Sequence, residues 1–81
     1  MKLSELYIDL SGNPTHKVEK NGVSTGVVLQ KDDSTWIYQF SLGHITYESH
    51  GDYDTKEEAA EELIIGFSKM IFNAYKQLNL N

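Results

Sequence analysis

Apolar and polar residues alternate through the middle of the chain with the two-residue period of β-strands. The clearest case is TWIYQFS (35–41), in which the aromatic residues fall on one face of the predicted strand. HITYES (44–49) alternates in the same way after a predicted turn at Leu42-Gly43. The opposite faces are more polar, so we expect the less polar faces to lie against a core. Those faces carry Trp36, Tyr38, Phe40, Ile45 and Tyr47.

Two further strands are predicted before this pair. VSTGVVLQ (23–30) is rich in β-branched residues and follows Asn21-Gly22, a dipeptide that favours a tight hairpin turn. The partner across that turn would be THKVEK (15–20), which is short and polar and is expected to form an edge strand. Residues 1–10 fit a helix and a strand equally well.

After residue 50 the pattern changes to the period of a helix. Thr55 and Glu58 have the spacing of a capping box, and the helical pattern continues to about Leu78. At about 100° per residue, one apolar stripe runs along the whole predicted helix. We expect that stripe to cover the sheet. Its members are Ala60, Ile64, Phe67, Ile71, Ala74 and Leu78, widened by Leu63, Met70 and Tyr75.

These elements predict one small domain over residues 1–81. Its fold class is α+β, with an antiparallel meander of three to four strands packed against one long C-terminal helix in two layers. The length of 81 residues is near the lower limit for a domain held by a single core.

Two apolar residues do not belong to the predicted stripe. Ile65 and Phe72 lie on a flank of the helix beyond Glu61 and Ser68. A surface helix needs only one apolar face, so this flank needs an explanation. Three explanations stay open: residues 1–10 fold over it, a second copy of the chain binds it, or a different protein binds it.

The chain has a formal net charge of −5, and the charge is concentrated in one segment. Residues 48–62 contain seven carboxylates and only one lysine. Without a basic face, the chain is not expected to bind nucleic acid. Capping, the helix dipole and solubility are sufficient reasons for an acidic helix start. The alternative is a surface that mimics nucleic acid and binds a basic partner. It would comprise Asp52, Asp54, Glu57, Glu58, Glu61 and Glu62.

Candidate chemistry is sparse. The chain has no cysteine, and its three histidines have no nucleophile or hydrolase motif near them. His44, Glu48 and His50 could suggest a metal site, but six residues of extended strand separate the two histidines by about 20 Å. We therefore predict no enzyme activity, no catalytic residue, no metal and no cofactor. The row of aromatic residues leaves a sheet-based RNA- or DNA-binding domain as a further alternative.

A strand pair followed by DTKEEAAEEL resembles the arrangement in many small β-β-β-α domains. These include the amino-terminal domains of phage-type integrases and the partly ribonuclease-H-like antitoxins. The resemblance covers about residues 35–65. The arm-binding domains of integrases are typically basic, whereas this helix start is acidic, so the resemblance implies no functional residue here.

The expected function is that of a non-enzymatic protein-interaction module, a small accessory or regulatory protein of bacterial or phage origin. It would bind a protein partner or a second copy of itself through Ile65, Phe72, Glu61 and Ser68. No signal peptide or membrane span is visible, so the expected location is the cytoplasm.

Overall fold

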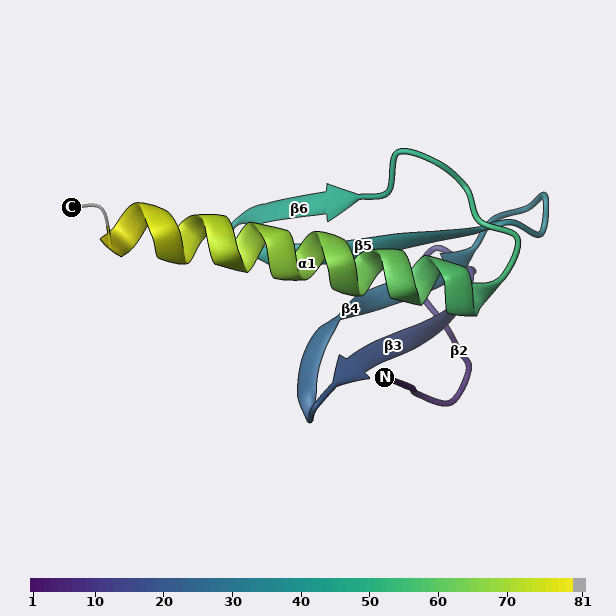
Figure 1. Ribbon diagram of the computed structural model, residues 1–81. Coiled ribbons are helices and arrows are strands. Elements are labelled where there is room, and N and C mark those ends of the chain that lie inside the picture. The colour runs from purple at the N-terminus through teal and green to yellow at the C-terminus, as the bar shows by residue number, and fades with distance from the viewer. Residues whose placement is uncertain (80–81) are drawn as a thin grey trace.

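The structure is a computed structural model that describes the backbone of residues 1–79 and the side chains of residues 1–76. Five strands of a sheet lie side by side, and one long helix crosses one face of the sheet (Figure 1). The elements are β1 (Lys2–Leu3), β2 (Tyr7–Ile8), β3 (Pro14–Lys20), β4 (Val23–Gln30), β5 (Trp36–Leu42), β6 (Ile45–Glu48) and α1 (Lys56–Asn79). The predicted α+β fold is confirmed.

The sheet is antiparallel throughout, with the order β1-β3-β4-β5-β6. The strand β2 also pairs with β3, beyond the end of β1. The sheet therefore contains more strands than the predicted three to four, because residues 1–10 contribute two short ones. The prediction that residues 15–20 form an edge strand was wrong, since β3 has neighbours on both sides.

The predicted tight turn between β3 and β4 is confirmed. Asn21 has φ 54° and Gly22 has φ 78°, the left-handed conformation that these two residue types tolerate best. The turn between β5 and β6 lies at Gly43 and His44, one residue later than expected, with Gly43 at φ 63°.

The helix begins where the sequence predicts. The backbone N–H of Glu58 donates a hydrogen bond to Oγ1 of Thr55 at 3.1 Å, as an N-cap requires. The acidic residues Glu57 and Glu58 occupy the first turn, where the positive end of the helix dipole favours them.

The first half of α1 forms the core with β3, β4 and β5. Phe40 is central: it packs edge-on against Phe67 with ring centroids 5.7 Å apart, and it stacks on Tyr47 at 5.1 Å. Trp36 and Tyr38 also pack against this cluster, so the predicted orientation of the aromatic row is confirmed. The buried members are Val18, Val28, Phe40, Ala59, Ala60, Leu63 and Ile64.

Gly26 allows the sheet and the helix to approach closely. Pairing between β4 and β5 ends at Val27 and Gln39, and the two strands diverge beyond that point. A Cβ atom on Gly26 would lie 2.9 Å from the Cβ of Phe40 and 3.0 Å from Cδ1 of Leu63. It would also clash with the backbone oxygen of Gln39 at 2.4 Å, so no side chain fits here.

The C-terminal turns of α1, after Met70, extend beyond the sheet (Figure 1). A helix of 24 residues is roughly 36 Å long, whereas a strand of seven residues spans roughly 24 Å. The prediction that the whole stripe covers the sheet was therefore wrong: Ile71 is 45% exposed and Ala74 is exposed. Ile45, near the end of the β5–β6 hairpin, is 59% exposed rather than in the core. The side chain of Leu78 lies outside the described residues.

We expect Gly26→Ala to lower the free energy of unfolding by about 1–3 kcal/mol, because the new methyl group must displace backbone and core atoms. Urea denaturation monitored by circular dichroism measures this. Gly51→Ala is the matched control, since Gly51 has open space around its Cβ position and no positive φ. Equal effects of the two substitutions would contradict the close contact at Gly26.

Candidate interaction surface

The helix α1 carries large apolar side chains on the side that faces away from the sheet. Ile65 is 47% exposed and Phe72 is 64% exposed, whereas Leu63 is fully buried and Ile64 is 8% exposed. At about 100° per residue, Ile65 and Phe72 point in nearly the same direction, roughly opposite to Leu63. The two side chains therefore form an outward face that the fold itself does not use.

Two polar residues complete this outward face. Glu61 lies one turn before Ile65, and Ser68 lies between Ile65 and Phe72; both are exposed. We call the set of Glu61, Ile65, Ser68 and Phe72 the outward face of α1. Because all four predicted residues occur on one helix, the helix backbone alone brings them together.

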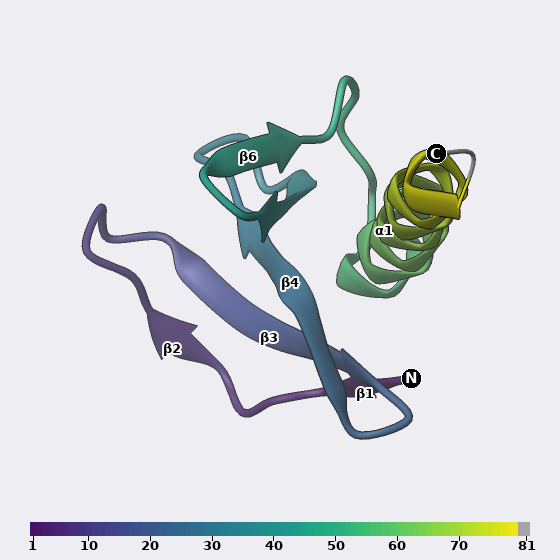
Figure 2. The ribbon, with the colours of Figure 1, turned by 90° about the vertical axis from the view of Figure 1, so that its left-hand side faces the viewer.

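The N-terminal segment approaches one border of this face but does not cover it. Residues 1–10 run along β3, on the sheet side of the molecule (Figure 2). Met1 and Lys20 line an open hollow of about 380 Å³ with Glu61, Ile64 and Ile65. Ile65 nevertheless remains about half exposed, and Phe72 is not among the residues that line the hollow.

Further exposed apolar residues extend the surface, and the sequence pattern did not identify them as exposed. Ile71 and Tyr75 lie on the part of α1 beyond the sheet, with 45% and 66% of their surfaces exposed. Their place in the helical stripe suggested burial. Comparing the predicted helix length with the predicted strand lengths would have shown that the sheet is too short to cover them.

Charges are segregated along α1. Four carboxylates lie in its first two turns, while Lys69 and Lys76 lie in its second half, all exposed. The six acidic residues of the alternative surface are all exposed too. Among the described residues there is one salt bridge, between Asp52 and Lys31, with a distance of 3.2 Å between Oδ2 and Nζ. These acids thus lie around the start of α1. The described residues show no group of three or more of them that could hold a metal ion.

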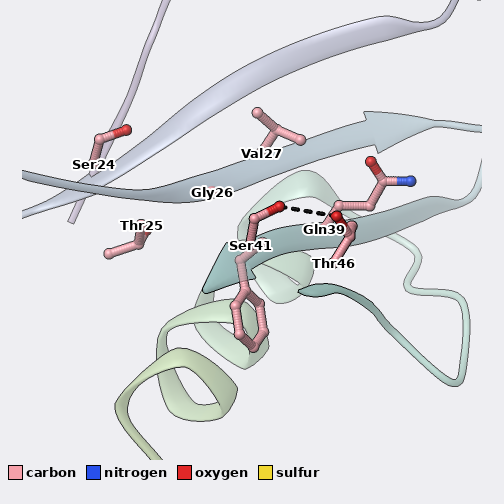
Figure 3. Close-up of a pocket in the computed structure, with 8 residues that line it drawn as sticks. Ser24, Thr25, Gly26, Val27, Gln39, Ser41 and Thr46 are labelled. Atoms are coloured by element: carbon pink, nitrogen blue, oxygen red, sulfur yellow. Dashed lines mark hydrogen bonds between the residues drawn. The ribbon is translucent and has the colours of Figure 1, made fainter. Parts of the chain in front are cut away.

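A second hollow, of about 320 Å³, lies where β4 and β5 diverge (Figure 3). Hydroxyl groups line much of it, and the Ser41 and Thr46 hydroxyls are hydrogen-bonded to each other at 3.0 Å. None of its lining residues carries an acid, a base or a cation. The residues that line this hollow therefore include no carboxylate, histidine or lysine.

The three histidines lie apart from one another. His16 is buried, its Nδ1 lies 2.8 Å from the backbone oxygen of Ser4, and its ring packs beside Trp36. His44 lies in the β5–β6 turn and His50 in the loop before α1, both exposed. Within the described residues, no group of three or more histidines and carboxylates could hold a metal ion.

Three titratable groups have shifted pKa values, and each shift has a structural cause. Burial raises the pKa of Tyr53, with smaller effects of Tyr38 and Glu62. Hydrogen bonds from the Thr35 hydroxyl and backbone lower the pKa of Asp33. The hydrogen bond to Asp52 raises the pKa of Lys31. These groups belong to separate local contacts and do not converge on one site.

Comparison with family models, with curated proteins and with solved structures finds no match to the chain. Along the described residues, the structure also contains no helix with the length and apolar character needed to cross a membrane.

If the outward face does not serve folding, Leu63 and Ile65 should respond differently to truncation. We expect Leu63→Ala to cost about 2–4 kcal/mol of unfolding free energy, because it leaves a cavity in the core. Ile65→Ala should cost less than about 1 kcal/mol, because alanine also favours the helix. Thermal and urea unfolding of both variants measure the difference. Similar losses would show that Ile65 belongs to the core.

Proposed function

We propose that this protein is a non-enzymatic protein-interaction module that acts through the outward face of α1. The observation that carries the proposal is the exposure of Ile65 and Phe72, at 47% and 64%, on the side of α1 opposite its core contacts. Apolar residues gathered on an exposed surface commonly mark an interface with another protein.

The energetic argument compares the free chain with the bound one. Fully burying an Ile or Phe side chain stabilises by about 1.5–3 kcal/mol, so covering the exposed parts of these two yields about half of that for each. This burial does not contribute to the stability of the folded chain alone, whereas it would stabilise a complex with a partner that packs on the face. Aromatic residues such as Phe72 are also frequent at the centres of interfaces.

The proposal assigns the chain to small accessory or regulatory proteins of bacterial or phage origin that act in the cytoplasm. The small size and the absence of cysteine support this part of the proposal. The partner is a protein, either a different chain or a second copy. The proposed mode of action requires no cofactor, metal, nucleic acid or membrane.

A photo-crosslinking amino acid in place of Phe72 tests the proposal in cells that produce the full chain. Because the side chain at 72 is expected to be buried against a protein partner, irradiation should yield a covalent adduct with a polypeptide. The same amino acid in place of exposed Asp32, in the loop before β5, is the matched control and should yield none. Absence of any polypeptide adduct at position 72 would reject the module.

A second candidate function is that of an acidic inhibitor that mimics nucleic acid. The observation in its favour is that all six carboxylates around the start of α1 are exposed. Such a protein would bind a basic partner through charge, so binding should weaken steeply with salt.

Reversal of Glu58 and Glu61 to lysine tests this second function. Affinity for a basic nucleic-acid enzyme should fall by at least about tenfold at low salt, since each reversal replaces attraction by repulsion. Titration calorimetry at two salt concentrations measures this. Binding that survives both high salt and charge reversal would exclude the mimic.

The sheet-based nucleic-acid-binding domain stays an untested alternative. Trp36, Tyr38 and Phe40 pack against the core cluster under α1, an arrangement that does not favour an open stacking platform.

A further inference from the structure

We infer that the occupant of the outward face of α1 is the same face of a second copy of the chain, with the two helices antiparallel. The inference rests on the proposed function, because it names the partner of that same surface. Four observations support it: the segregation of charge, the spacing of four residues, the absence of a salt bridge at two charges among the described residues, and the open side of the helix.

The segregation of charge selects the orientation. The carboxylates of α1 are confined to its first two turns, and two of its three lysines lie in its second half. Parallel helices would place acidic end against acidic end. Antiparallel helices place the acidic end of each copy beside the second half of the other helix, where Lys76 lies, which is the favourable arrangement.

The spacing of the outward face selects the register. Ile65 and Phe72 lie at equal distances on either side of the midpoint between Ser68 and Lys69, and so do Glu61 and Lys76. In an antiparallel pair centred on that midpoint, Ile65 of one copy meets Phe72 of the second copy. Glu61 of each copy then meets Lys76 of the other. A two-fold axis repeats both contacts, as an isologous dimer requires.

The two charges at the ends of this pattern lack partners of opposite sign on their own helix. The positions three and four residues away from Glu61 hold Glu57, Glu58, Ile64 and Ile65. Those before Lys76 hold Phe72 and Asn73. The one salt bridge among the described residues joins Lys31 to Asp52. Neither Glu61 nor Lys76 therefore takes part in a salt bridge there. Opposite charges three or four residues apart stabilise a helix, and residues 56–79 contain no such pair.

The geometry of the monomer leaves room for such a pair. In the view nearly along α1, every strand lies on one side of the helix, and the other side is open (Figure 2). The register uses almost the whole helix, because residue 58 of one copy lies opposite residue 79 of the other. The small side chain of Ser68 at the centre permits the close approach of two helices.

Analytical ultracentrifugation of the purified full chain tests orientation and register together. We expect a concentration-dependent dimer, weakened at least about tenfold by Glu61→Lys or by Lys76→Glu, since each creates two like-charge contacts. The double variant E61K/K76E restores attraction and should return the dissociation constant to within about threefold of wild type. Asp32→Lys makes the same change in charge as Glu61→Lys but lies outside α1, so it should have no effect. Circular dichroism confirms that each variant is folded.

Disulfide formation gives a second, independent measurement in a chain that has no cysteine. In the proposed register, Ser68 lies beside Ser68 of the second copy, offset by about 1.5 Å along the axis. Ser68→Cys should therefore oxidise readily to a covalent dimer. Residue 73 and its copy would lie about 13 Å apart along the axis, so Asn73→Cys should not.

The outcomes separate this inference from the proposed function. A chain that stays monomeric to about 1 mM overturns the homodimer, and an adduct of position 72 with a different protein would still support the module. A dimer that Phe72→Glu leaves intact overturns the homodimer through the outward face, while the crosslink at position 72 to a different protein still decides the proposed function. A dimer that Phe72→Glu abolishes but the double charge exchange fails to restore overturns the antiparallel register.

Discussion

The contact between Gly26 of β4 and Leu63 of α1 is the constraint on which the rest of the structure depends. At this point the helix lies directly on the sheet, because a glycine leaves space that any side chain would fill. Phe40 closes the contact from β5, and its ring holds Phe67 and Tyr47 around it. The position of this contact fixes which turns of α1 lie over the sheet and which turns pass its edge.

The same contact determines the direction of the outward face. Since Leu63 points into the sheet, the helical period directs Ile65 and Phe72 away from it. The surface that we propose as functional is thus a geometric consequence of the core. A change in the side of α1 that packs on the sheet would bury those residues and expose others. The fold and the interaction surface therefore both depend on which side of α1 packs against the sheet.

Much of this arrangement could be predicted from the sequence because the signals were local. The Asn21-Gly22 turn, the alternation in 35–41 and the cap at Thr55 each depend on a few neighbouring residues, and each is present in the structure. The strands β1 and β2 were left open, because two-residue strands are too short to show a period. Their formation depends on a long-range partner, β3, that the local pattern cannot reveal.

The extent of the core was harder to predict for a similar reason. A helical stripe shows which side of a helix is apolar, but it does not show where the surface beneath it ends. Ile45 and Ile71 fit the pattern of core residues and are exposed because the β5–β6 hairpin turns at Gly43. Ile65 and Phe72 could be recognised from the sequence because they departed from the stripe, which is a property of the helix alone.

The length of α1 beyond the sheet has a consequence for the cooperativity of folding. Helical turns with few tertiary contacts are held mainly by their own backbone hydrogen bonds, and short isolated helices are only marginally stable in water. The described turns after Met70 should therefore open in local fluctuations that leave the core intact, and their amide protons should exchange with solvent sooner than those near Leu63. Any molecule that binds these turns would slow that exchange. The exchange rate of their amide protons therefore measures how much of the protein has a partner bound at this end of α1.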